Sequence, residues 1–261
     1  MPTIHFTPLW RPQKVSWIYP TASDKSVLEN IRSKNARKFL RTIPEFLQLN
    51  NFEINSGACT FKEYTEFLEL YNERTAARGF DPIARADWFS AKKREGKKVE
   101  KIFVRHNNQL IGGKIITIIG GEVRSSYKAS QQLPMFQKLH NASLGLILDY
   151  LMLEQYIKGK PTLLTAGTSR NLFGVFNTIG YLIFKLRMGY QPIVVNPKTV
   201  FEQTTKNPNK NIWFTFLSDS ATINRPLTLY FSGDLNQVPQ LTELQKLIST
   251  KKLTEAVQYS S

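Results

Sequence analysis

The spacing of apolar residues predicts helices in the first third of the chain. After Thr60, apolar positions at Phe61, Phe67 and Leu68 follow helical spacing, and Thr60 with Glu63 forms the pattern of a capping box. A second helix is predicted over 87–94. The segment 23–50 also has helical spacing and is followed by a short predicted strand over 51–55.

Three runs rich in apolar and β-branched residues come next, and they predict an antiparallel meander. The runs are separated by polar or glycine-containing turns and cover residues 101–105, 110–119 and 122–129. Gly112 and Gly113 stand together in the second run. A glycine pair inside a strand fits a β-bulge or a close backbone approach.

Helices and strands then alternate. The pattern predicts a helix over 143–158, a strand over 162–166, a helix over 171–188 and a strand over 190–195. A buried helix between two strands needs a crossover connection, which makes a locally parallel pair. The fold class predicted is α/β (α+β): a mixed sheet in which an antiparallel meander passes into βαβα with splayed parallel strands, flanked by helices.

The ends of the chain are less regular. Residues 1–22 are rich in proline and aromatic residues and predict an extended arm, whereas 212–217 and 227–231 look like strands and 243–248 like a short helix. We therefore expect an N-terminal arm and basic helix over 1–56 that pack on a core over 57–196. An extension over 197–261 would complete or cover the sheet.

The net charge of the chain indicates which classes of molecule it could bind. The 261 residues include 35 Lys and Arg against 20 Asp and Glu, so the net charge is +15. Such a surface attracts nucleic acid, phosphorylated cofactors or acidic lipid headgroups. Basic residues crowd the segments 32–41 and 92–98. A solvated helix face and an anion-binding surface are both consistent with them.

Cysteine and histidine are scarce. The single cysteine, Cys59, cannot close an intramolecular disulfide, and with three histidines a zinc site of Cys and His clusters is not expected. Cys59 has no cationic neighbour in sequence that would lower its pKa, so we expect it to be structural. No basic segment followed by a long apolar run opens the chain, and no apolar stretch reaches the ~20 residues of a membrane helix. We expect a soluble cytoplasmic protein without a membrane span.

Three short motifs carry a resemblance to a known family. Residues 184–190 read Phe-Lys-Leu-Arg-Met-Gly-Tyr, residues 127–130 read Tyr-Lys-Ala-Ser, and residues 163–167 read Leu-Leu-Thr-Ala-Gly. With the order of elements from about 101 to 195, they resemble the GNAT superfamily of N-acyltransferases, and within it the Fem-like branch (FemAB/BioF-type, acetyltransferase-like). The resemblance covers a third to a half of the chain and implies acyl transfer to an amine.

The resemblance also implies an activated donor, either acyl-CoA as co-substrate or aminoacyl-tRNA, and no metal. The family's phosphate loop has two glycines where residues 138–143 read Lys-Leu-His-Asn-Ala-Ser. Asn141 tolerates positive φ, so the turn survives in principle. The cofactor-binding residues predicted on this basis are Lys138, Asn141, Ser143, Thr168 and Ser169.

Catalytic roles are implied for Lys185, Tyr127 and His140, and substrate contacts for Ser130 and Thr165. Lys185 stands where many family members have a tyrosine that protonates the leaving thiolate, and it could stabilise the developing charge instead. Each position also has a structural interpretation. Lys185 could be a solvated lysine, Tyr127 an aromatic ring packed on the sheet, and His140 a surface histidine.

The hydroxyls and the carboxylates also have structural interpretations. Ser143 and Asn141, like Thr168 and Ser169, could simply cap helices. Asp149 could be a partly buried base, although a surface or interface carboxylate fits the pattern better.

Two functions remain open at this stage. The first is an N-acyltransferase that acts on a primary amine of a small molecule, amino sugar or peptide. The second is a basic, non-catalytic module that binds nucleic acid on a degenerate acyltransferase fold, with tRNA or another polyanion on its basic surface. The acyl chain, the acceptor and the oligomeric state do not follow from the sequence.

Overall fold

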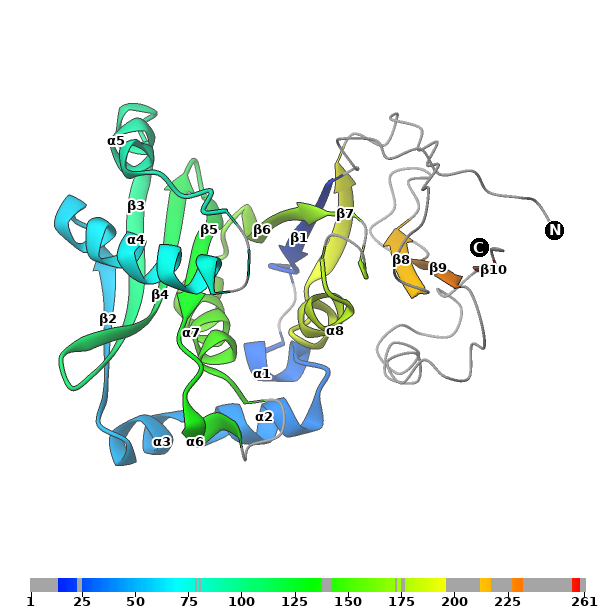
Figure 1. Cartoon of the computed structure of the whole chain (residues 1–261), viewed down its shortest axis with the longest axis horizontal. Helices are drawn as coiled ribbons and strands as arrows, with labels where there is room; N and C mark the ends of the chain where they lie inside the picture. The colour runs from blue at the N-terminus through cyan, green and yellow to red at the C-terminus, as the bar shows by residue number, and fades with distance from the viewer. Residues whose placement is uncertain are drawn as a thin grey trace. The chain divides into compact units, whose positions relative to one another are not determined.

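The computed structural model describes residues 14–22, 25–77, 79, 81–137, 142–171, 173–174, 177–195, 212–216, 227–231 and 255–258. The chain divides into two compact units (Figure 1). The larger unit is Thr21–Ala166, and the second unit combines Met1–Pro20 with Gly167–Ser261. The predicted boundaries at 56 and 196 stay a prediction.

The larger unit contains the predicted meander. Its elements are α1 (Val27–Asn30), α2 (Lys34–Arg41), α3 (Ile43–Leu49), β2 (Phe52–Ala58), α4 (Phe61–Ala76), α5 (Ala86–Arg94), β3 (Lys98–His106), β4 (Gln109–Ile119), β5 (Glu122–Ser130), α6 (Pro134–Gln137), α7 (Leu144–Ile157) and the first half of β6 (Leu163–Arg170). Strands β2 to β5 are antiparallel neighbours, and β5 pairs with β6 in parallel. The mixed α/β fold class, with a meander that passes into a parallel crossover, is confirmed.

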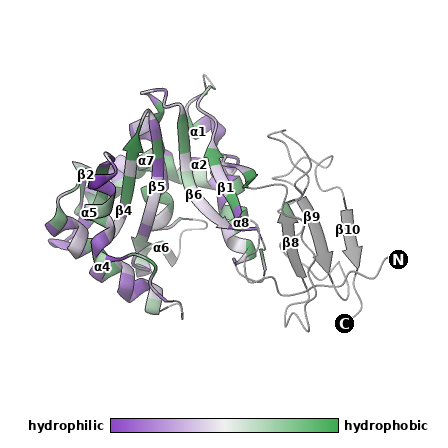
Figure 2. Cartoon of the chain, turned by 90° about the horizontal axis from the view of Figure 1, so that it is seen from above, coloured by the Kyte–Doolittle hydropathy of each residue, from purple (hydrophilic) through white to green (hydrophobic). Residues whose placement is uncertain are grey.

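Helices cover both faces of this sheet, and the glycine pair shows how closely. Consecutive strand residues point to opposite faces. A Cβ on Gly112 would lie 2.7 Å from Leu144 of α7, and a Cβ on Gly113 would lie 2.7 Å from Phe67 of α4. Both glycines therefore permit side chains of a helix to pack directly on β4. Of the two predicted alternatives the bulge is confirmed, because the register of β4 against β3 shifts directly before Gly112, whereas the close neighbours of the glycines are side chains and not backbone. Figure 2 shows hydrophilic residues on α4 and α5, a largely hydrophobic β4 and hydrophilic stretches on β5.

The second unit contains β1 (Lys14–Tyr19), the end of β6, α8 (Ile179–Arg187), β7 (Gln191–Val195), β8 (Ile212–Phe216), β9 (Leu227–Phe231) and β10 (Glu255–Gln258). The strand β1 lies antiparallel to β7, and Trp17 of β1 is fully buried with edge contacts to Phe173, Tyr181 and Phe216. In hydrogen-bonded order the first sheet is β2-β3-β4-β5-β6-β1-β7, and β10-β9-β8 form the other. Residues 14–19 of the predicted arm thus form a strand in which Val15, Trp17 and Tyr19 are buried.

The predicted helix over 171–188 is wrong in its first half. Strand β6 continues to Arg170, and α8 begins only at Ile179. Two local features explain the difference. Gly174 has a φ of +105°, outside helical geometry, and the Asn171 side chain pairs with the backbone of Phe216 at 2.8 Å instead of capping a helix. The hydroxyl of Thr178 caps α8 by accepting from the N–H of Tyr181.

The segment 23–50 is broken into α1, α2 and α3 rather than one helix. Ser33 caps α2, and Pro44, in the first turn of α3, has no N–H to continue the preceding helix. The predicted helix over 243–248 lies outside the described residues. In the part of the chain that the structure describes, no helix is long and apolar enough to cross a membrane.

Candidate functional site

The parallel strands β5 and β6 run together for only three residue pairs. Glu122, Val123 and Arg124 lie opposite Leu163, Leu164 and Thr165, and the register ends there, although β5 continues to Ser130. The two strands are therefore neighbours that part after Arg124. This is the splayed pair that the order of elements predicted.

A β-bulge marks the point where the strands part. On the other side of β5, Ile115 lies opposite Tyr127 while Ile116 lies opposite Ser125, so Ser126 is an extra residue of β5. Its hydroxyl lies 3.1 Å from that of Thr117. A bulge bends its strand and increases the local twist, which gives a physical cause for the separation from β6.

The N-terminus of α7 lies on one face of this region. Ser143 caps the helix, with its hydroxyl accepting from the N–H of Leu146 at 3.1 Å. Around Gly145, a Cβ would have the Ser130 hydroxyl at 3.6 Å, the Ser143 hydroxyl at 3.8 Å and the Lys128 ammonium at 3.8 Å. Three polar groups from β5 and α7 therefore meet where the helix begins.

A buried charge cluster joins the same elements. Asp149 of α7 is 1% exposed and forms ion pairs with Lys114 of β4 and with Lys128 of β5, the latter at 2.8 Å. The two lysines lie directly opposite each other in the sheet, and Lys114 is completely buried. Asp149 is thus a buried centre of two ion pairs, and the expectation of a surface or interface carboxylate is wrong.

Burial governs the charge of this cluster. Burial lowers the pKa of Lys114 to about 8, and the Asp149 carboxylate offsets part of that shift. Two ammonium groups on one carboxylate leave an excess positive charge under α7 below that pKa. A lone lysine within the apolar run 110–119, and a lone aspartate on an apolar helix, were the sequence signals that could have identified the cluster.

The opposite face is aromatic. Tyr127 of β5 is half-buried between Trp88 of α5, at a centroid distance of 5.0 Å, and Tyr71 of α4, at 5.5 Å. Tyr64 stacks on Trp88 and donates its hydroxyl hydrogen to the carbonyl of Arg85 at 2.8 Å. Burial raises the pKa of Tyr127, so its phenol stays protonated at neutral pH. Tyr127 therefore occupies the packed position that its structural interpretation described.

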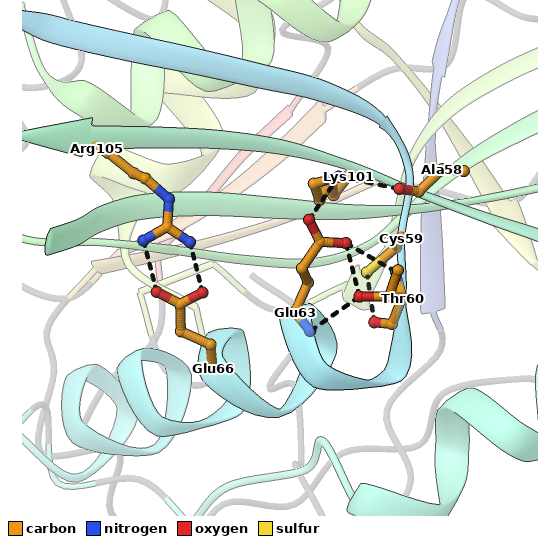
Figure 3. A network of polar contacts seen from close by, with 7 residues as sticks. All are labelled: Ala58, Cys59, Thr60, Glu63, Glu66, Lys101 and Arg105. Atoms are coloured by element: carbon orange, nitrogen blue, oxygen red, sulfur yellow. Dashed lines mark hydrogen bonds and ion pairs between the residues drawn. The ribbon is translucent and has the colours of Figure 1, made fainter. Parts of the chain in front are cut away.

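Polar contacts fasten α4 to the sheet (Figure 3). The ammonium of Lys101 donates to the carbonyl of Ala58 at 2.9 Å and pairs with Glu63 at 3.0 Å, while Arg105 pairs with Glu66 through two bonds. Glu63 also completes the predicted capping box, which is confirmed. These contacts hold α4, which contributes Tyr64 and Tyr71 to the aromatic face, against the sheet.

Cys59 lies beside this network and is buried. Burial raises the pKa of its thiol to about 12, so the thiolate is not populated at neutral pH. The side chain therefore acts as a small apolar group, as the sequence indicated.

The predicted site residues fall into three groups. Lys138, His140 and Asn141 lie outside the described residues. In the larger unit, Ser130 and Ser143 meet near Gly145, Tyr127 is on the other face of the sheet, and Thr165 is buried in the last pair with Arg124.

In the second unit, Thr168 and Ser169 belong to β6 and cap no helix. Thr168 is exposed, and Ser169 accepts the indole hydrogen of Trp17 at 2.8 Å. The capping interpretation of both residues is wrong because the strand continues through them.

Lys185 is on α8 and is 3% exposed, so the interpretation as a solvated lysine is wrong. Its ammonium lies over the rings of Tyr190, Tyr181 and Phe184, with centroids at 4.8, 5.4 and 5.8 Å. Cation–π contacts of this kind stabilise a cation away from water.

No protein-family model and no curated protein matches the chain. Solved structures that match include FemX (13% identity, TM-score 0.48, 72% of this chain and 60% of that chain). A tandem GNAT protein from the clavulanic acid biosynthesis pathway also matches, at 10% identity and a TM-score of 0.41, over 71% of this chain and 52% of that chain. The C-terminal DUF2156 domain of a putative lysylphosphatidylglycerol synthetase from Agrobacterium fabrum matches at 8% identity and a TM-score of 0.42, over 70% of this chain and 58% of that chain.

The chain thus spans between about half and three fifths of the length of these proteins. FemX and the GNAT protein carry the names of the two groups that the sequence resembles. At these identities and TM-scores the likeness carries no argument about this chain, so the functional proposal rests on the geometry of the chain itself.

Proposed function

We propose that this protein is an N-acyltransferase that moves an acyl or aminoacyl group from acyl-CoA or a similar activated donor to a primary amine. The amine would belong to a small molecule, an amino sugar or a peptide. The observation that carries the proposal is the parting of β5 and β6 after Arg124, with the bulge at Ser126 at the same place. A strand edge that leaves its partner offers backbone N–H groups to a carbonyl oxygen of the donor.

The reaction needs little more than alignment and charge stabilisation. The amine attacks the polarised carbonyl carbon, its proton passes to a base or to water, and the donor's thiolate or hydroxyl leaves. No covalent bond to the enzyme is required. The absence of a reactive cysteine in this scheme agrees with the raised pKa of Cys59.

The two faces of the sheet suggest where the substrates lie. The anionic part of the donor would lie on the α7 side, where the helix N-terminus, Lys128 and the hydroxyls of Ser130 and Ser143 are placed. The acceptor would lie on the aromatic side, against Tyr127 and Trp88.

The remaining assignments come from the sequence resemblance and stay proposals. Lys138 and Asn141 would contact the donor, as would Thr168 and Ser169. His140 would act as a base, Lys185 would stabilise the leaving group, and Thr165 would contact the substrate. Lys185 is the sharpest of these to test because it is a buried cation.

Two tryptophan variants, one in β6 and one directly before it, test whether the opening between β5 and β6, where the two strands part after Arg124, is the site. Ala166 is half-buried and is the first β6 residue after the last pair, whereas Thr162 is exposed and precedes the paired residues. We expect Ala166→Trp to fill the opening and abolish both donor binding and amine acylation. The matched variant Thr162→Trp should retain both.

Donor binding is measured as a ligand-induced rise in Tm with acetyl-CoA and with a charged tRNA, and acylation by mass spectrometry of an amine panel. Circular dichroism checks that both variants fold. Full activity in a folded Ala166→Trp variant would refute the proposed site. If neither donor raises Tm and no amine is acylated, the alternative of a non-catalytic nucleic-acid-binding module replaces the enzyme.

A further inference from the structure

The helix α2 presents an unbalanced row of cations to solvent. Lys34, Lys38 and Arg41 are exposed, and they lie on one side of the helix because they are spaced by four and three residues. No acidic residue occurs between Glu29 and Glu45 in the sequence. Among the described residues, no ion pair joins any of these three side chains to a carboxylate.

The N-terminal part of this row is unfavourable in the free protein, although Lys38 and Arg41 lie in the last turn, where the dipole favours cations. Like charges three or four residues apart on a helix repel, and Lys34 repels both Arg37 and Lys38. Lys34 is also in the first turn, where the helix dipole favours an acidic residue and α2 has none. An external anion would relieve both effects.

The other basic segment is different. In α5, Lys92, Lys93 and Arg94 occupy the last turn, where the dipole favours cations. Glu95 accepts ion pairs from Lys92 at 2.5 Å and from Lys97 at 2.7 Å. The basic residues after α5 therefore have both a favourable place on the helix dipole and carboxylate partners. In α2, Lys38 and Arg41 also lie in the last turn, where the dipole favours them, but no ion pair to a carboxylate is found for them among the described residues, and Lys34 has neither explanation.

We propose that the exposed face of α2 is a docking surface for the phosphodiester backbone of a nucleic acid. At 1.5 Å per residue, the row from Lys34 to Arg41 extends about 10 Å, and a duplex carries about one phosphate charge per 1.7 Å of its axis. The row therefore faces several phosphates at once. This inference does not depend on acyl transfer.

The packing of α2 favours a nucleic acid over a membrane. The apolar side of the helix is buried through Ala36 and Leu40, so it cannot insert into lipid. Phe39 packs on Phe46 at 5.4 Å and on Phe136 of α6 at 6.3 Å. No aromatic ring of α2 is therefore available to stack on bases, and binding should not depend on base sequence.

The first experiment compares two triple variants of the full chain with equal loss of charge. K34Q/K38Q/R41Q removes the row on α2, and K93Q/R94Q/K98Q removes three exposed cations near the end of α5. Binding of a short fluorescein-labelled RNA duplex is followed by anisotropy. Affinity of the wild type should fall about 40-fold between ~50 and ~200 mM salt through three phosphate contacts. The α2 variant should bind at least about tenfold more weakly at low salt and lose most of this salt dependence.

The α5 variant should bind like the wild type. Equal losses in both triple variants would show a diffuse charge effect and overturn the proposal. So would binding to phosphatidylserine vesicles that depends on α2 without any binding of RNA. Strong discrimination between two duplex sequences would contradict backbone recognition.

The second experiment tests whether Lys34 lowers the stability of the free protein while it strengthens the binding of RNA. Lys34→Glu replaces two repulsions by attractions and puts an acidic residue in the first turn, so Tm should rise by about 4 °C while RNA affinity falls. A fall in both Tm and affinity would mean that the lysine serves the fold, and the proposal would then fail. Changes in Tm induced by acetyl-CoA, which is not a nucleic acid, are measured on the same samples and report on the acyl-transfer site separately.

Discussion

The cluster of Asp149 with two lysines gives the strongest quantitative prediction. Because one carboxylate serves two ammonium groups, the two ends of the cluster are not equivalent. Asp149→Asn leaves Lys114 buried and opposite Lys128 with no counter-charge, whereas Lys114→Met leaves the pair between Asp149 and Lys128 at 2.8 Å intact.

The magnitudes follow from burial. Loss of one partner of a buried ion pair costs about 3–5 kcal/mol, so Asp149→Asn should lower the free energy of unfolding by about that amount. Replacement of a buried charge by an apolar side chain of similar size is nearly neutral or stabilising, so at pH 7 Lys114→Met should change stability by less than about 1 kcal/mol. Glu66→Gln, which breaks the partly exposed pair with Arg105, is the control and should cost at most about 1 kcal/mol.

The pH dependence gives a separate check of the same cluster. Burial lowers the pKa of Lys114 from 10.5 to about 8, so between these values the unfolded chain binds more protons than the folded one. The free energy of unfolding of the wild type, relative to Lys114→Met, should therefore rise by roughly 3 kcal/mol as pH increases from 8 to 10.5. Below pH 8 the difference should be constant, because Lys114 is then protonated in both states.

Urea unfolding followed by circular dichroism measures these differences at each pH. A Lys114→Met variant as unstable as Asp149→Asn would refute the reasoning. It would mean that the buried Asp149 carboxylate is stabilised by its ion pair with Lys114 and that the ion pair with Lys128 is not sufficient. A pH-independent difference between the wild type and Lys114→Met would show that the pKa of Lys114 is the same in the folded and unfolded states, and hence that burial does not lower it.

Three further outcomes are expected. Gly113→Ala should lower stability by about 1–3 kcal/mol in urea unfolding, because its Cβ would lie 2.7 Å from the ring of Phe67; a neutral effect would mean that α4 shifts freely. Thr60→Ala should cost about 1 kcal/mol through loss of the cap of α4, and Thr60→Ser should restore most of it. Lys185→Met should lower the rate of amine acylation with little change in Tm, since methionine suits its aromatic surroundings; unchanged turnover would remove Lys185 from the proposed mechanism.

Local patterns in the sequence determined much of the fold. The capping box at Thr60, the three runs of the meander and the glycine pair at 112–113 each depend on residues close together in the chain, and each was predicted correctly. The parallel pair followed from the need for a crossover between two strands. Short-range spacing is sufficient where a helix or strand is set by its own residues and its immediate cap.

Tertiary structure decided the rest. Strand β6 extends through Thr168 and Ser169 because residues far away in sequence, such as Trp17, meet it there. Asp149 and Lys114, 35 residues apart, become a buried pair only when α7 packs on β4. A charged side chain in an apolar run shows in the sequence, but its partner and its pKa depend on contacts that no local pattern contains.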